Sequence, residues 1–158
     1  MIKIIAIVDA DFGISKNGGI PWSFGEDLRF FREKTINQTI IMGRKTFFSL
    51  PHGPLKNRQN YVVSRKFKNM AGADKVFESL ESAVASHPDS WIIGGASIFN
   101  YALAYGLVDY AIITKVKNRY DADTFLSACE LENSFEQKLI EDKKKFAIFE
   151  YTKNRKPL

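Results

Sequence analysis

Cysteine and histidine are the scarcest reactive residues of this chain. Cys129 is the single cysteine among 158 residues, and His52 and His87 are the only histidines. One cysteine excludes an internal disulfide and favours a reducing, cytoplasmic setting. Neither histidine belongs to a motif that would activate Cys129, so we interpret this residue as a small, buried hydrophobic side chain. No group of potential ligands has metal-binding spacing, and we expect no metal.

Several longer patterns are also missing. No apolar run is long enough to span a bilayer, and no signal-peptide pattern follows Met1, so we expect no membrane partner. The G-x-G-x-x-G fingerprint and the Walker pattern are absent, which excludes an ordinary Rossmann domain and a P-loop enzyme. No serine lies on a nucleophile elbow. What is present is a chain with 45% hydrophobic and 26% charged residues, typical of one globular domain covering residues 1–158.

The formal net charge of +5 raises the question of a nucleic-acid partner. Basic residues are scattered, apart from the run at 143–145, which we interpret as a solvated hairpin turn between two strands. The chain lacks a strand face that combines aromatic and basic side chains. Small anionic ligands suit the same charge, so we expect no nucleic acid.

Short apolar runs alternate with helical patterns along the chain. The nearly continuous run at 2–8 is typical of a central strand covered on both faces. Further strands are expected at 39–42, 60–64, 75–77, 90–93, 109–116 and around 135–140 and 146–152, and helices at about 23–35, after Gly43, after Ser79 and at 98–105. The alternation predicts a single α/β domain with a doubly wound, mostly parallel central sheet, an antiparallel C-terminal strand and flanking helices.

Glycine follows a predicted strand at two junctions, MGRKT at 42–46 and IGGAS at 93–97. Glycine lets a ligand approach the backbone, and the helix N-terminus behind it supplies free N–H groups. Ser64 and Arg65 follow a third strand. In an open α/β sheet these strand ends share the edge where ligands bind. Each junction alone is consistent with a tight turn, but the three together predict a multiply phosphorylated ligand such as a dinucleotide.

A glycine-rich loop at 9–25, containing NGGIPW at 17–22, precedes the carboxylate of Asp27. A loop of this length is usually functional. An acid near a helix N-terminus is ordinarily a surface residue that interacts with the helix dipole. Leu28 and Phe31 follow at i+1 and i+4, however, so the face that carries Asp27 is partly apolar. A carboxylate in such a place is suited to holding or protonating an uncharged heterocycle.

In this order and spacing, the blocks resemble dihydrofolate reductase over nearly the whole chain. The resemblance rests on Ile5 and Ala6, residues 13–22, Asp27, Leu28, Phe31, residues 41–47, Ser49, Pro54, Leu55, residues 58–60, 63–65 and 93–99, and Thr114. Two positions depart from the family: Ser15 replaces a common glycine in the loop, and Phe99 stands where tyrosine is frequent.

The resemblance implies that NADPH gives hydride to C6 of the pterin ring of dihydrofolate, that N5 gains a proton and that tetrahydrofolate leaves, in support of one-carbon metabolism and thymidylate synthesis. Asp27 would bind the 2-amino group and N3, supported by Thr114, while Trp22 would assist through a water molecule. Arg58 would clamp the glutamate α-carboxylate with its planar fork. The implied substrate site comprises Ile5, Asp27, Leu28, Phe31, Leu50, Arg58, Ile93 and Thr114.

The resemblance also implies a site for NADPH, with a lid at 9–24 closing over the nicotinamide. Ser64 and Arg65 would contact the 2′-phosphate, and the start of the helix after Gly95 would hold the pyrophosphate. The Gly94–Gly95 peptide bond is expected to be cis. The implied cofactor residues are Ala6, Ile7, Ile14, Ile20, Gly43, Arg44, Lys45, Thr46, Ser64, Arg65, Gly94, Gly95, Ala96, Ser97, Ile98 and Phe99.

Two alternatives remain beside this interpretation. A reductase of a pyrimidine or of another pterin would share the fold, but it would have no glutamate for Arg58 to hold. A catalytically idle nucleotide-binding module would be expected to lack Asp27 or the lid sequence. The resemblance further implies a monomer that binds dihydrofolate, NADPH and antifolate inhibitors.

Overall fold

The structure, a computed structural model, describes the backbone of residues 1–15 and 25–154 and the side chains of residues 1–15 and 28–154. The strands are β1 (Ile2–Val8), β2 (Gly13–Ser15), β3 (Thr39–Gly43), β4 (Gln59–Val63), β5 (Lys75–Phe77), β6 (Ser90–Gly94), β7 (Tyr110–Val116), β8 (Thr124–Phe125), β9 (Phe135–Asp142) and β10 (Phe146–Lys153). The helices are α1 (Gly25–Thr35), α2 (Arg44–Ser49), α3 (Leu80–Ser86), α4 (Ala96–Ala104) and α5 (Ala128–Ser134).

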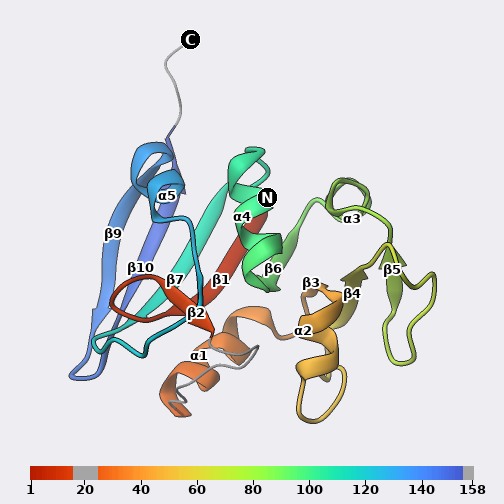
Figure 1. Ribbon diagram of the computed structural model, residues 1–158, viewed down its shortest axis with the longest axis horizontal. Helices are drawn as coiled ribbons and strands as arrows, with labels where there is room; N and C mark the ends of the chain where they lie inside the picture. Colours follow the sequence, from red (N-terminus) through yellow and green to blue (C-terminus); the bar gives the residue numbers. More distant parts are fainter. Residues whose placement is uncertain (16–24, 155–158) are drawn as a thin grey trace.

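Eight of these strands form one sheet in the order β5-β4-β3-β6-β1-β7-β10-β9 (Figure 1). The pairs from β5 to β7 are parallel, whereas β10 runs antiparallel to both β7 and β9. Residues 143–145 form the hairpin turn between β9 and β10. The mostly parallel sheet with an antiparallel C-terminal strand is therefore confirmed.

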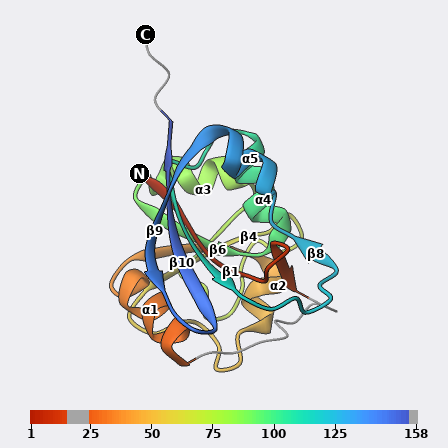
Figure 2. The ribbon, with the colours of Figure 1, turned by 90° about the vertical axis from the view of Figure 1, so that its left-hand side faces the viewer.

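Helices cover both faces of the sheet (Figure 2). Phe31 of α1 and Phe47 of α2 pack on one face, in a cluster with Ile5 and Ile112. Helices α3, α4 and α5 pack on the other face through side chains that include Ala83, Leu103 and Leu131. The strand β1 contributes to both clusters because successive side chains alternate between the faces. This arrangement places the carboxyl ends of all six parallel strands along one edge.

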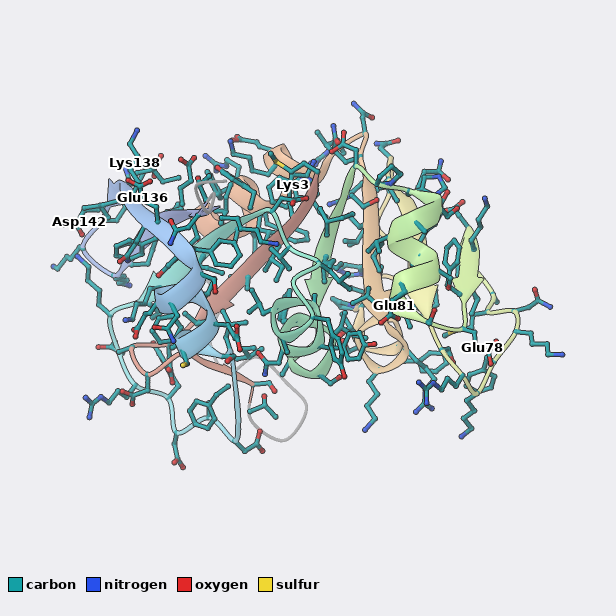
Figure 3. All side chains as sticks on the ribbon, turned by 90° about the horizontal axis from the view of Figure 1, so that it is seen from above. Lys3, Glu78, Glu81, Glu136, Lys138 and Asp142 are labelled. Atoms are coloured by element: carbon teal, nitrogen blue, oxygen red, sulfur yellow. The ribbon has the colours of Figure 1, made fainter. Side chains whose placement is uncertain are left out.

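The outer strand β9 has exposed side chains from Glu136 to Asp142. Figure 3 shows Glu136, Lys138 and Asp142 along this edge, where charge discourages pairing with another strand. Among the described residues, no helix is long and apolar enough to cross a membrane.

The sequence did not predict β2, β8 or α5. Strands β2 and β8 have only three and two residues, and α5 has seven. Elements this short do not show a clear periodic pattern of apolar residues. The interpretation of Cys129 as a buried side chain is wrong: it is exposed, because α5 buries Leu131 instead. The predicted start of helix α4, residue 98, is wrong, since the helix begins at Ala96. Its N-cap is a glycine without a capping side chain, so the sequence carries no local signal for the first turn.

Candidate active site

A cavity of about 790 Å³ lies at the carboxyl edge of the sheet. It is lined where β3 passes into α2, where β4 ends, where β5 passes into α3 and where β6 passes into α4. The lining residues are Ser15, Gly43, Arg44, Lys45, Thr46, Ser49, Val63, Ser64, Arg65, Glu78, Ser79, Leu80, Glu81, Gly95, Ala96, Ser97, Ile98, Tyr101, Asp123 and Thr124. The three junctions predicted to share a ligand thus meet in one cavity.

Glycine at these junctions allows close packing of the two helix starts. A Cβ atom on Gly95 would lie 3.2 Å from Thr46 Oγ1, and one on Gly43 would lie 3.1 Å from Ile98 Cγ1. The Gly94–Gly95 peptide bond is cis, as the resemblance implied. Gly95 is the N-cap of α4, and as a glycine it has no side chain to accept hydrogen bonds from the first N–H groups of this helix. Such a terminus can bind phosphate oxygens.

Three cationic side chains, Arg44, Lys45 and Arg65, line the cavity. The Arg44 guanidinium lies 5.9 Å from the centre of the Phe67 ring, a cation–π contact that holds it near the end of β4. Ser64 is buried, and its Oγ accepts hydrogen bonds from the N–H groups of Lys66 at 3.2 Å and Phe67 at 3.1 Å. These bonds fix the turn that presents Arg65. The cavity therefore combines three cationic side chains, one of them held against an aromatic ring, with uncapped N–H groups.

An apolar surface lies on the α1 face of the sheet. Ile5 is buried there, and Phe31, Leu50 and Ile93 pack against the same cluster. Thr114 is 2% exposed and lies opposite Ile7 in the register between β1 and β7. It follows Ile112 by two residues, so its side chain points to the face that α1 covers. A buried hydroxyl thus lies on the face of the sheet that carries α1.

Arg58 is held at the C-terminal end of α1. Its Nη1 donates to Thr35 Oγ1 at 3.0 Å, and its Nε donates to the Lys56 carbonyl at 3.1 Å. Thr35 in turn donates to the Phe31 carbonyl at 2.9 Å. Burial, and to a smaller extent the charge of Arg32, lowers the pKa of Arg58. The guanidinium nevertheless stays charged, so a carboxylate that bound to its remaining N–H groups would compensate for both effects.

Buried Asn60 shapes the loop that carries Arg58. Its side-chain amide donates to the carbonyls of Leu55 at 2.9 Å and Arg58 at 3.1 Å, and its Oδ1 accepts from the Leu55 N–H at 3.0 Å. The Asn60 N–H donates to Asp74 Oδ2 at 2.7 Å. Because both ends of the loop are bonded to one buried side chain, the position of Arg58 is fixed from the sheet side as well as from α1.

The start of the predicted lid is anchored to a distant segment. Strand β2 pairs with β8, and the hydroxyls of Ser15 and Thr124 are hydrogen-bonded to each other. Buried Asp9 accepts from the N–H groups of Asp11 and Gly13, both at 2.8 Å, and from that of Tyr120 at 3.2 Å. Ser15, which departs from the family pattern, therefore contributes a side-chain bond that glycine could not make.

Some predicted site residues lie elsewhere or outside the described residues. Ile20 and Trp22 are outside them, and Asp27 lies in α1 with a side chain that is not described. Leu28 is 54% exposed, whereas the Phe99 side chain of α4 is 2% exposed and packs in the core. In the described part of the chain, the residues that line the cavity do not include Ala6, Ile7, Ile14, Gly94 or Phe99.

Sequence reasoning missed several residues of this region, and four of them form side-chain hydrogen bonds that shape it. Thr35 and Asn60 position Arg58, whereas Glu81 and Tyr101 line the cavity and are hydrogen-bonded to each other. A threonine four residues after Phe31 can bond back to the helix carbonyl, which was the one local signal for Thr35. The bond between Glu81 and Tyr101 joins residues 20 positions apart, whereas the partners of Asn60 are nearby in a loop without a periodic pattern.

The fold and site together define a nucleotide-binding α/β domain. A sequence model of the family described as dihydrofolate reductase matches residues 1–155. Dihydrofolate reductase from Saccharomyces cerevisiae is 32% identical over 164 residues, covering 87% of this chain and 77% of the yeast protein. The chain therefore belongs to the dihydrofolate reductase family.

Other relatives differ in how much of the chain they match. Dihydrofolate reductase from Mycobacterium tuberculosis (strain H37Rv) is 46% identical over 94 residues, and the match spans 58% of each chain. A solved structure of dihydrofolate reductase from Enterococcus faecalis, complexed with NADP(H) and RAB-propyl, superposes with a TM-score of 0.81 at 27% identity. That superposition covers 98% of this chain and 97% of the Enterococcus faecalis chain, so the whole fold is shared.

Proposed function

We propose that this protein reduces 7,8-dihydrofolate to 5,6,7,8-tetrahydrofolate with NADPH. In this reaction a hydride ion moves from the nicotinamide to C6 of the pterin ring, a proton is added at N5, and NADP⁺ and tetrahydrofolate are released. The observation that best supports the proposal is the cavity at the carboxyl edge, where Arg44, Lys45 and Arg65 accompany the uncapped start of α4.

The cavity suits the phosphate-bearing part of NADPH, which would supply the hydride when bound. Residues 95–98 would donate backbone N–H groups to the pyrophosphate, and Arg44, Lys45 and Thr46 would contact phosphate oxygens. Ser64 and Arg65 would hold the 2′-phosphate that distinguishes NADPH from NADH. The close approach of Thr46 to Gly95 supports this assignment, because a larger residue at 95 would fill the space between the two helix starts.

Asp27, on α1, would hold the 2-amino group and N3 of the pterin and favour a protonated ring. Thr114 would support this carboxylate, since its buried hydroxyl lies on the sheet face that α1 covers. Trp22 and a water molecule would assist proton delivery, and the lid would exclude bulk water. Ile5, Phe31 and Leu50 would form apolar walls.

Arg58 would bind the α-carboxylate of the glutamate, and this role favours a folate over a smaller pterin or a pyrimidine. The guanidinium is fixed by Thr35 and Lys56 and retains N–H groups beyond those two bonds. A small heterocycle without an acidic arm would not occupy them. Binding of the arm would add affinity at a distance from the reacting atoms.

The test is the fall in NADPH absorbance with purified protein and dihydrofolate, run beside NADH and beside reactions without dihydrofolate. We expect oxidation that requires dihydrofolate and prefers NADPH. The variant E136Q removes a charge from the distant strand β9 and should behave like the parent. NADPH binding without turnover would contradict the proposed substrate, and pyrimidine and other pterin substrates would then be assayed.

A further inference from the structure

The nucleotide cavity carries acidic as well as basic groups. Glu78, Glu81 and Asp123 line it together with the three cations. Figure 3 shows Glu81 at the first turn of α3, on the side that faces α4, and Glu78 in the segment between β5 and α3. A site built solely to attract a phosphorylated ribose would gain nothing from carboxylates in its wall. Their presence indicates a second influence on ligand choice.

Glu81 is held in this wall by a specific contact. The Tyr101 hydroxyl of α4 donates to Glu81 Oε1, which links α3 to α4 in the wall of the cavity. Ser79 caps the same helix, accepting from the Ser82 N–H at 3.1 Å. The Tyr101 hydrogen bond, a backbone N–H and the charge of Arg65 lower the pKa of Glu81, so this group is anionic at neutral pH. The carboxylate is thus both fixed and charged.

Arg65 lines the same cavity as Glu81 and Tyr101, and its positive charge contributes to lowering the pKa of Glu81. An anionic group on the ribose that paired with Arg65 would therefore also lie near the Glu81 carboxylate. Glu81 would then lower the affinity for a 2′-phosphate in two ways. Its negative charge repels the phosphate, and it also attracts the Arg65 guanidinium that would otherwise pair with the phosphate alone. Both effects weaken ligands with a 2′-phosphate relative to ligands without one.

We propose that Glu81, positioned by Tyr101, is a specificity-determining residue that narrows the preference of the cavity for NADPH over NADH. The inference rests on the proposed function, because it assumes that the phosphate-bearing ribose lies beside Arg65. Glu81 would contact none of the reacting atoms. It acts through its charge on the affinity for one phosphate.

The test uses two probes that differ only in the 2′-phosphate, adenosine 2′,5′-bisphosphate and adenosine 5′-monophosphate. Calorimetric titration of the full chain at low ionic strength gives the ratio of their dissociation constants. E81Q keeps an oxygen acceptor for Tyr101 and removes the charge. We expect it to raise the preference for the bisphosphate by about two- to fivefold, as for partly screened charges several ångströms apart.

The matched control is E136Q, which makes the same change of charge on the opposite side of the molecule and should leave the ratio unchanged (Figure 3). The gain in E81Q should shrink at an ionic strength of about 1 M, where charges are screened within about 3 Å. The ratio of kcat/KM for NADPH to that for NADH should rise in parallel.

Different failures have different meanings. An equal ratio in E81Q and E136Q, with turnover intact, overturns the role of Glu81 and leaves the proposed function standing. A gain that persists at high salt also overturns it, since a change in packing rather than charge would be responsible. A parent protein that binds neither the bisphosphate nor NADPH overturns the proposed function and the inference with it.

Discussion

Thr35 offers a sharp test of how the substrate site is built. Its side chain is completely buried, accepts a hydrogen bond from Arg58 Nη1 at 3.0 Å and donates one to the Phe31 carbonyl at 2.9 Å. Valine has nearly the same shape and is also β-branched, so T35V removes the hydroxyl with little change in volume. Arg58 would then keep its bond to the Lys56 carbonyl and lose its anchor on α1.

We expect T35V to weaken the binding of the substrate's glutamate carboxylate by Arg58. A hydrogen bond to a charged group contributes about 1.5–3 kcal/mol, but Arg58 is only partly buried and water would replace part of the loss. A remaining loss of about 1–1.4 kcal/mol corresponds to a KM for dihydrofolate raised roughly five- to tenfold. Since Arg58 would bind a part of the substrate that does not react, kcat should change little.

T35S is the matched control because it keeps the hydroxyl and deletes a buried methyl group. It should destabilise the protein by about 1 kcal/mol, or roughly 2–4 °C in Tm, while KM stays near that of the parent. Steady-state assays with dihydrofolate and with a dihydropterin lacking the benzoylglutamate arm separate the two substitutions. An unchanged KM in T35V, or an equal rise with the arm-less substrate, would refute the reasoning.

Three further substitutions probe other parts of the molecule. D27N should lower dihydrofolate reduction at least about a hundredfold near neutral pH, and full activity would remove Asp27 from the site. R65A should weaken NADPH more than NADH in binding titrations, and equal losses would separate Arg65 from the 2′-phosphate. Lys3 lowers the pKa of Asp89 through a 2.7 Å hydrogen bond. The pair therefore stabilises the folded state fully above the unfolded pKa of about 3.9, and this stabilisation is lost as the pH falls through the lower pKa of the folded state. D89N should cost at most about 1 kcal/mol at neutral pH, with its melting curves converging with those of the parent in acid, whereas a constant difference would contradict the assignment.

The parts of the fold that were predictable have strong local patterns. The apolar run of β1 and the hairpin between β9 and β10 could be placed because each is bounded by clear polar or turn residues. The pair β2 and β8 could not, since its few residues are stabilised by contacts between segments more than 100 residues apart, such as Ser15 with Thr124. Tertiary context, rather than local propensity, determines such elements.

The same distinction holds for the site. The glycine junctions and the Ser64-Arg65 pair were predictable because strand ends in a parallel sheet meet at one edge. The anchoring of Arg58 by Thr35 was not, because it joins residues 23 positions apart, and neither was the bond between Tyr101 and Glu81, 20 positions apart. Local pattern identifies groups that contact a ligand more readily than groups that position them.

Strand β6 explains how two ligands could meet in this fold. Ile93 packs with the cluster on the α1 face, where the pterin would lie, whereas Gly95, two residues on, is the N-cap of α4 and lines the nucleotide cavity. The two proposed halves of the site would therefore be separated by one residue, Gly94, at the end of a central strand. Hydride transfer requires the donor and acceptor carbons to be in contact. A site made of one face of the sheet and its carboxyl edge can satisfy this requirement only at the strand ends, which is where the glycines would allow both ligands to approach the backbone.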